Sequence, residues 1–135
     1  MVEVQIAYQG NLRCQARHME SGNTMVTDAP KDNHGKGESF SPTDLVGTAL
    51  GTCMLTIMGI QAERMGVDLG GTTVIVQKEM IADPLRRIGK LAVQFNIPAK
   101  LGAEDRQKLE NAARTCPVHK SLSPAVQVPI TFNWG

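Results

Sequence analysis

The middle of the chain decides its fold. It reads SFSPTDLVGTALGTCMLTIMGI over residues 39–60. Ser41 can cap a helix, Pro42 suits the first helical position, and Asp44 stands three residues after the cap, as the acid of a capping box does. The sequence therefore predicts a helix that starts here and runs to Met65, where a glycine follows as its stop. Its first four turns are apolar almost all round, which predicts a buried central helix.

Strand patterns lie on both sides of this helix. Residues 2–9 and 12–18 alternate apolar and polar side chains, and a short strand is expected near 24–27. The full order βββ-α-ββ-α-β predicts an α+β fold. The elements predicted after the central helix are two strands that form a hairpin, an amphipathic helix and a final strand, at 72–82, 86–97, 103–115 and 126–134.

Length and composition set further bounds. A chain of 135 residues, of which 41% are hydrophobic and 20% charged, suggests one globular domain over residues 1–135. The formal net charge of +1 gives no reason to expect nucleic acid as a partner. The uncharged stretch from Leu45 to Gln61 is short for a membrane-spanning helix and contains three glycines, so no membrane partner is expected either.

Three cysteines stand at positions 14, 53 and 116. The N-terminus lacks a basic region followed by an apolar one, so no signal peptide is expected, and an odd number of cysteines does not suggest a secreted disulfide framework. A cytoplasmic location is therefore expected, where a cysteine pair tends to be catalytic, redox-sensing or metal-binding. Zinc is a competing interpretation of three cysteines and three histidines. The chain lacks C-x-x-C and H-x-x-x-H spacings, so no metal or other cofactor is expected.

Cys53 lies on the predicted apolar helix. A buried cysteine often acts only as a small apolar side chain, and that interpretation competes with a reactive thiol. A thiolate in the middle of a helix needs a cation from elsewhere. Arg13 and Arg17, on the polar face of one predicted strand, carry permanent charges that could stabilise it.

Cys116 stands in the segment TCPVHK, residues 115–120. The proline after it predicts the start of a short helix, whose free N–H groups and dipole would lower the pKa of the thiol. His119 completes a C-x-x-H spacing, which is also compatible with a surface or core-edge histidine. Cys14, on an apolar strand face, is expected to be a core cysteine.

The segments around Cys53 and Cys116 resemble one family. SFSPTDLVGTALGTCMLTIMGI resembles the central-helix signature, and AARTCPVHKSLSP the second cysteine region, of the osmotically inducible and organic-hydroperoxide-resistance (OsmC/Ohr) proteins. The chain looks closest to the OsmC-like branch, and the resemblance covers nearly all of it. It implies the OsmC-like fold as an intertwined homodimer, in which two long central helices pack together and each site lies at the dimer interface.

The same resemblance implies a cysteine peroxidase that uses no metal. Cys53 would be the peroxidatic thiolate that becomes a sulfenic acid, and Cys116 the resolving thiol that forms a disulfide with it, in defence against oxidative stress. A dithiol reductant, of lipoyl type in relatives, would restore the pair. The apolar side chains around Cys53 would favour an organic hydroperoxide as substrate, and the residues expected to bind it are Ala49, Leu50 and Ile57.

The sequence departs from the family pattern in one place. The hydroperoxidase branches place a glutamate ten residues before the first cysteine and pair it with an arginine, whereas this chain has Thr43 there. Glu38, in the polar loop 28–40, could replace the glutamate, and Arg13 is a better match for the arginine than Arg17. The departure leaves an alternative function open, a non-enzymatic ligand-binding or redox-sensing dimer of the same fold.

Overall fold

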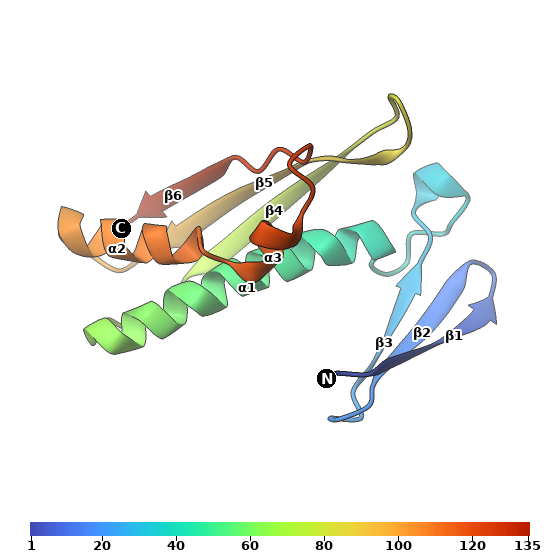
Figure 1. Cartoon of the computed structure of the whole chain (residues 1–135), viewed down its shortest axis with the longest axis horizontal. Coiled ribbons are helices and arrows are strands. Elements are labelled where there is room, and N and C mark those ends of the chain that lie inside the picture. Colours follow the sequence, from blue (N-terminus) through green and yellow to red (C-terminus); the bar gives the residue numbers. More distant parts are fainter. The chain divides into compact units, whose positions relative to one another are not determined.

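The computed structural model describes residues 1–135, which divide into two compact units, Met1–Val46 and Gly47–Gly135. We describe each unit by itself, and the single domain expected from the sequence stays a prediction. Figure 1 labels the elements in chain order. They are β1 (Val4–Gly10), β2 (Arg13–His18), β3 (Thr24–Asp28), the short helix η1 (Lys31–Asn33), α1 (Pro42–Met65), β4 (Thr73–Ile81), β5 (Arg87–Ile97), α2 (Ala103–Ala113), α3 (Pro117–Ser121) and β6 (Ile130–Trp134).

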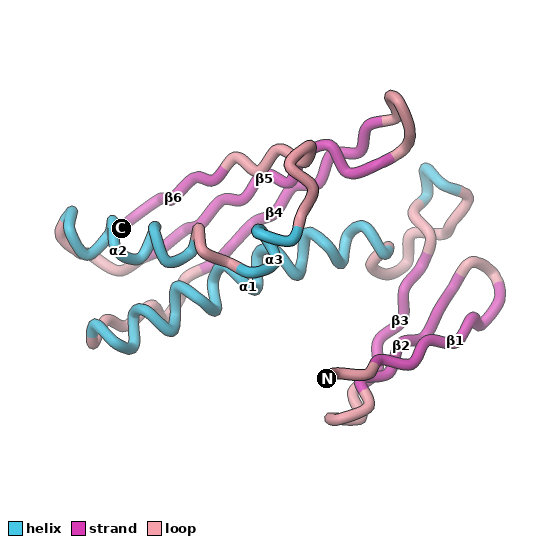
Figure 2. The backbone as a smooth tube through the Cα atoms, viewed as in Figure 1, coloured by secondary structure: helices cyan, strands magenta, loops and turns pink.

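The first unit contains an antiparallel meander in the order β1-β2-β3, which confirms the predicted strands (Figure 2). The turn between β1 and β2 lies at Asn11 and Leu12, which both have positive φ, at 55° and 61°. The register sets Arg13 of β2 directly opposite Asp28 of β3. Because paired residues point to the same face of a sheet, this register brings the guanidinium and the carboxylate together.

Helix α1 begins with the predicted capping box. The backbone N–H of Asp44 donates to Ser41 Oγ at 3.1 Å, and the backbone N–H of Ser41 donates to Asp44 Oδ2 at 2.9 Å. Two N–H groups that the helix itself leaves without partners are thereby satisfied. The helix ends at Met65, and Gly66 adopts a φ of 70°, the left-handed conformation usual after a helix.

The second unit contains a three-stranded sheet with β5 in the centre, antiparallel to β4 and parallel to β6. Figure 1 shows α1 and α2 on the same face of this sheet. Alternate residues of β5 point to that face and are buried, while their neighbours face outward. The order of elements and the two helices confirm the predicted α+β fold. The core joins Leu91, Val93, Phe95 and Ile97 of β5 to Leu50, Met54 and Met58 of α1 and to Leu109 and Ala113 of α2.

The predicted long central helix is α1, and in the single chain it packs on the sheet by one side. Only one face of the helix is buried, the face of Gly47, Leu50, Gly51, Met54, Met58 and Ala62. Ala49 is exposed and Ile60 is 43% exposed, because a helix that packs on a sheet covers only the side in contact with it. By length and composition alone α1 also meets the criteria for a membrane-spanning helix, as core helices of other proteins do.

Two glycines allow α1 to approach β4 closely. A Cβ atom on Gly51 would lie 2.8 Å from Val76 Cγ2, and one on Gly47 would lie 3.4 Å from the same valine's Cγ1. Contacts below 3.0 Å force a shift, and a valine side chain has little freedom to give way. The part of α1 that carries Gly47, Gly51 and Cys53 is therefore held close to β4.

We expect Gly51→Ala to destabilise the protein, although alanine is the better helix former. Overpacking costs about 1–3 kcal/mol, whereas the gain in helix propensity is only about 1 kcal/mol. Gly59→Ala is the matched control, since a Cβ there meets open space, and it should raise stability by about 1 kcal/mol. Urea unfolding of both variants measures the difference. A Gly51→Ala protein as stable as Gly59→Ala would contradict the close approach.

Candidate active site

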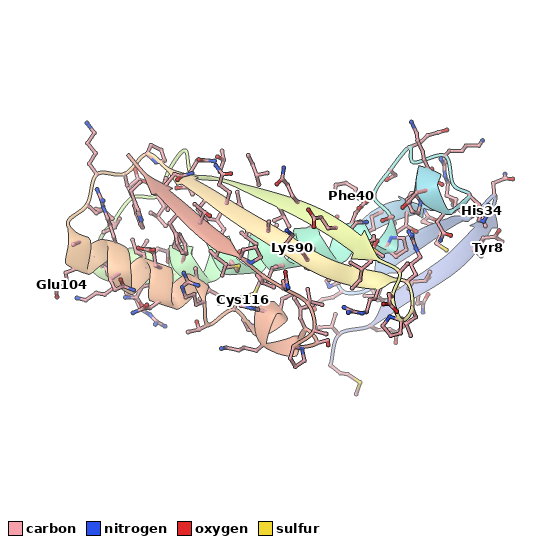
Figure 3. All side chains as sticks on the ribbon, turned by 90° about the horizontal axis from the view of Figure 1, so that it is seen from above. Tyr8, His34, Phe40, Lys90, Glu104 and Cys116 are labelled. Carbon is pink, nitrogen blue, oxygen red and sulfur yellow. The ribbon has the colours of Figure 1, made fainter.

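The two predicted reactive cysteines lie together in the second unit. The Cys53 side chain hydrogen-bonds with the Cys116 side chain, and both thiols are free rather than bridged. Cys53 comes from the middle of α1, and Cys116 from the turn between α2 and α3, where Figure 3 labels it. Residues far apart in the sequence thus form one pair of sulfurs.

Cys116 is the N-cap residue of α3. Its φ of −50° and ψ of 125° are not helical, and Pro117 occupies the next position, as the sequence predicts. The backbone N–H of His119 donates to Cys116 Sγ at 3.4 Å. The sulfur therefore caps the helix as a serine hydroxyl oxygen does at other N-caps. The C-x-x-H spacing therefore places the backbone of His119, rather than a metal site, next to the thiol.

The predicted lowering of the Cys116 pKa is wrong. Burial raises the pKa of Cys116, since its side chain is 0% exposed, and the hydrogen bond with Cys53 raises it further. The N–H groups of His119 and Val118 act in the opposite direction, as expected for a helix start, but they do not outweigh burial. Burial is thus the largest influence on the pKa of the Cys116 thiol.

The charge of Cys53 also opposes ionisation of Cys116 and adds to the raised pKa of Cys116. A pair of sulfurs in contact holds one negative charge far more easily than two. The partly exposed Cys53 and the fully buried Cys116 thus differ in their surroundings.

In the first unit, Arg13 and Glu38 lie together as part of a three-residue cluster. Arg13 Nη2 lies 3.3 Å from Asp28 Oδ2 and 3.3 Å from Glu38 Oε2. Hydrogen bonds to Glu38 and Asp28 hold the pKa of Arg13 above its ordinary value. Two carboxylates thus share the charge of the predicted activating arginine, whereas Arg17 is an exposed residue of the same strand.

Sequence reasoning missed Asp28, the buried member of this cluster. It is 1% exposed, and its Oδ2 also accepts the backbone N–H of Glu38 at 3.0 Å. That bond, together with Arg13, lowers the pKa of Asp28 although burial opposes it. The position of Asp28 opposite Arg13 in the predicted meander is the signal that could have revealed this residue.

Asp28→Asn is expected to lower the thermal unfolding midpoint at pH 7. Because the folded-state pKa of Asp28 lies below its unfolded value, its stabilisation is present above the unfolded pKa and is lost as the pH falls through the folded pKa. Thermal unfolding followed by circular dichroism from about pH 7 to about pH 2 should show that the midpoints of Asp28→Asn and the unmodified protein become equal in acid. Glu38→Gln is the control with a smaller effect, since Glu38 is 59% exposed. A difference in unfolding midpoint between Asp28→Asn and the unmodified protein that stays constant with pH would disprove stabilisation by the ionised Asp28.

The other predicted site residues fall in different environments. Leu50 is fully buried in the core, and its contact with substrate stays a prediction. Ala49 is exposed and Ile57 partly exposed on α1, and their contact with substrate stays a prediction. Cys14 is partly exposed rather than a fully buried core residue. No group of three or more His, Cys, Asp or Glu side chains is arranged to hold a metal ion.

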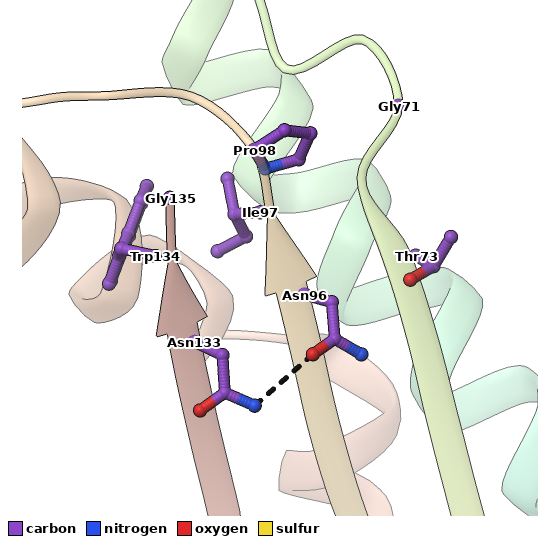
Figure 4. A pocket seen from close by; sticks show the side chains of 8 residues that line it. All are labelled: Gly71, Thr73, Asn96, Ile97, Pro98, Asn133, Trp134 and Gly135. Atoms are coloured by element: carbon purple, nitrogen blue, oxygen red, sulfur yellow. Dashed lines mark hydrogen bonds between the residues drawn. The ribbon is translucent and has the colours of Figure 1, made fainter.

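A surface hollow of about 270 Å³ lies at the end of the second sheet (Figure 4). Thr73, Asn96 and Asn133 line it from three paired strands, and Asn133 Nδ2 donates to Asn96 Oδ1 at 3.2 Å. Trp134 and Pro98 complete its rim. None of its lining residues is a cysteine, so this hollow is separate from the sulfur pair.

The fold and the sulfur pair define a class of protein, a small α+β protein with two free cysteines in contact beneath a three-stranded sheet. The family model described as OsmC-like protein matches residues 35–131. The chain therefore belongs to the OsmC-like protein family, as its resemblance to OsmC/Ohr proteins implied.

Solved structures agree with this assignment. A protein of Psychrobacter arcticus, provisionally described as an osmotic stress induced and detoxification response protein, is 44% identical, with a TM-score of 0.93 over 98% of this chain and 96% of that chain. The organic hydroperoxide resistance protein OsmC of Legionella pneumophila (15% identity, TM-score 0.79, 98% and 96% covered) and OhrB of Bacillus subtilis (18%, 0.72, 98% and 98%) share the fold. None of the curated proteins compared with the chain matches it significantly.

Proposed function

We propose that the protein is a thiol-dependent peroxidase that reduces organic hydroperoxides in defence against oxidative stress. The observation that carries the proposal is the contact between two free thiols of unlike burial, Cys53 and Cys116. The family supports it, since relatives of the same fold are organic hydroperoxide resistance proteins. The expected site of action is the cytoplasm, where thiols remain reduced.

The chemistry uses two electrons in each step. The Cys53 thiolate attacks one peroxide oxygen, the O–O bond breaks, and the departing alkoxide takes a proton to become an alcohol. Cys53 is left as a sulfenic acid. The Cys116 thiol then attacks this sulfenic acid, which forms the Cys53–Cys116 disulfide and releases water. A dithiol reductant, such as one of lipoyl type, returns both cysteines to thiols.

A second copy of the chain is the proposed structural partner. The face of α1 opposite the sheet carries apolar side chains that this chain leaves uncovered, including exposed Ala49 and Ile60. Packing of two such helices would bury this face, as proposed for the intertwined homodimer. Ala49 and Ile57 would then lie where an alkyl hydroperoxide can contact apolar side chains near Cys53.

A non-enzymatic role as a ligand-binding or redox-sensing dimer is the second candidate. It is favoured by Thr43, which stands where hydroperoxidase branches have a glutamate, and by the sharing of the Arg13 charge between Asp28 and Glu38. A guanidinium neutralised in this way stabilises a thiolate less than a free one does. Under this candidate the fold persists while peroxide consumption is slow.

Reaction with one equivalent of cumene hydroperoxide separates the two candidates. The reduced protein is mixed with the peroxide, and its disulfides are mapped by mass spectrometry, with hydrogen peroxide as a parallel. A rapid Cys53–Cys116 link, formed faster with the organic peroxide, is the result expected of the peroxidase. Thiols that remain unchanged after prolonged exposure would reject the peroxidase and favour the ligand-binding role.

A further inference from the structure

The two sulfurs of the proposed disulfide differ in their access to a reductant. Cys116 is 0% exposed, whereas Cys53 is partly exposed. Thiol–disulfide exchange requires the incoming sulfur to approach one of the two bridged sulfurs directly. Assembly with a second copy can only bury more surface, so it cannot make Cys116 accessible while the fold is kept.

The backbone also holds Cys116 in place. Its N–H donates to Ala113 O at 3.4 Å, its carbonyl accepts the N–H of Lys120 at 3.1 Å, and its sulfur accepts the N–H of His119. These contacts fix the turn between α2 and α3 from both sides. Exposure of the Cys116 sulfur would require this turn to open.

We propose that the reductant attacks the Cys53–Cys116 disulfide at the Cys53 sulfur and displaces Cys116 as the leaving thiolate. The inference rests on the proposed function, and it assigns the position of attack within that cycle. The thiolate of the reductant forms a bond to Cys53 Sγ, the S–S bond breaks, and its electron pair goes to Cys116 Sγ. The products are a mixed disulfide on Cys53 and a reduced Cys116.

The surroundings of Cys116 suit a leaving group in this step. The N–H of His119 points at the sulfur that receives the negative charge, and the N–H of Val118 acts in the same direction. Once Cys53 is bound in the mixed disulfide it carries no charge, so it no longer opposes ionisation of Cys116. Burial remains the opposing effect, and uptake of a proton from the solvent completes the departure.

The position of attack also specifies the kind of reductant. The released Cys116 stays next to the mixed disulfide and can attack Cys53 Sγ, which expels the reductant and restores the original disulfide. A monothiol is therefore ejected in most encounters. A dithiol escapes this reversal, because its second sulfur attacks its own first sulfur and frees Cys53 as a thiolate while the reductant becomes a cyclic disulfide.

Trapping of the mixed disulfide tests the inference. Cys14→Ser protein is oxidised with the thiol oxidant diamide, treated briefly with 2-mercaptoethanol, alkylated with iodoacetamide in denaturant so that the buried Cys116 can react, and mapped by mass spectrometry. We expect the mercaptoethanol adduct on Cys53 and the alkyl group on Cys116, in at least about tenfold excess over the reverse pattern. Equal adducts, or an excess on Cys116, would overturn the inference.

Diamide makes this outcome independent of peroxide chemistry. If diamide forms the disulfide but cumene hydroperoxide does not, the peroxidase proposal fails while the position of attack is still measured. A disulfide formed by both oxidants with the adduct on Cys116 leaves the peroxidase intact and rejects the inference. Failure of diamide to link the two cysteines would overturn the inference, since it requires that bond.

A pair of His119 variants provides a second measurement. His119→Pro removes the N–H that faces the Cys116 sulfur, and His119→Ala keeps it while removing the imidazole. We expect His119→Pro to slow reduction of the disulfide by dithiothreitol several-fold and His119→Ala to leave it within about twofold. Equal rates for all three proteins would reject the role of this N–H in the departure of Cys116.

Discussion

Replacement of Cys53 by serine is expected to abolish hydroperoxide consumption. A hydroxyl is a poor nucleophile at neutral pH, whereas a thiolate attacks the O–O bond readily. The rate should fall by at least about a thousandfold, within the range seen when other enzymes lose their nucleophile. The rate of cumene hydroperoxide consumption in the presence of a dithiol measures this loss of activity. The structure supports this choice, because Cys53 is the partly exposed member of the pair.

Cys14→Ser is the matched control for this experiment. Cys14 is also a partly exposed cysteine, but it lies on β2 of the first unit, and its change should leave the rate within about twofold. Inactivation by Cys14→Ser, with Cys53→Ser still active, would show that the nucleophile has been assigned to the wrong cysteine.

Replacement of Cys116 by serine is expected to permit one oxidation and then to stop the cycle. Cys53 can still attack the peroxide, but no thiol beside it can convert the sulfenic acid to a disulfide. One equivalent of peroxide should be consumed per chain, and dimedone should label Cys53. The serine keeps a side-chain oxygen at the N-cap of α3, so the helix start should survive the change.

Sustained turnover by Cys116→Ser at the rate of the unmodified protein would contradict the resolving role. It would mean that an external thiol reduces the sulfenic acid directly. A loss of the first oxidation as well would indicate that Cys116 helps to activate Cys53, through the hydrogen bond between the two sulfurs.

The features that could be predicted from the sequence depend on residues close together in the chain. Ser41 and Asp44 form their capping box within one helical turn, and Pro117 marks the start of α3 in the same local way. Alternation along β4 and β5 predicts the hairpin because each strand exposes one face. These signals need no knowledge of tertiary contacts.

The features that could not be predicted depend on tertiary packing. The pKa of Cys116 is raised by burial and by Cys53, neither of which lies near it in the sequence. The role of Asp28 requires the register of β2 against β3, which sets it opposite Arg13. The identity of the buried face of α1 follows from its contact with a sheet, whereas a helix that is apolar almost all round does not single out one face in its sequence.

The sulfur of Cys116 has two tasks, as a thiol and as the cap of α3. A thiolate accepts a hydrogen bond more strongly than a neutral sulfur does, so the N–H of His119 closes the first turn of this five-residue helix most firmly when Cys116 carries a negative charge. The order of α3 and the charge on the Cys116 sulfur thus support one another. A peptide segment with no reactive group of its own thereby takes part in the departure of Cys116 from the proposed disulfide.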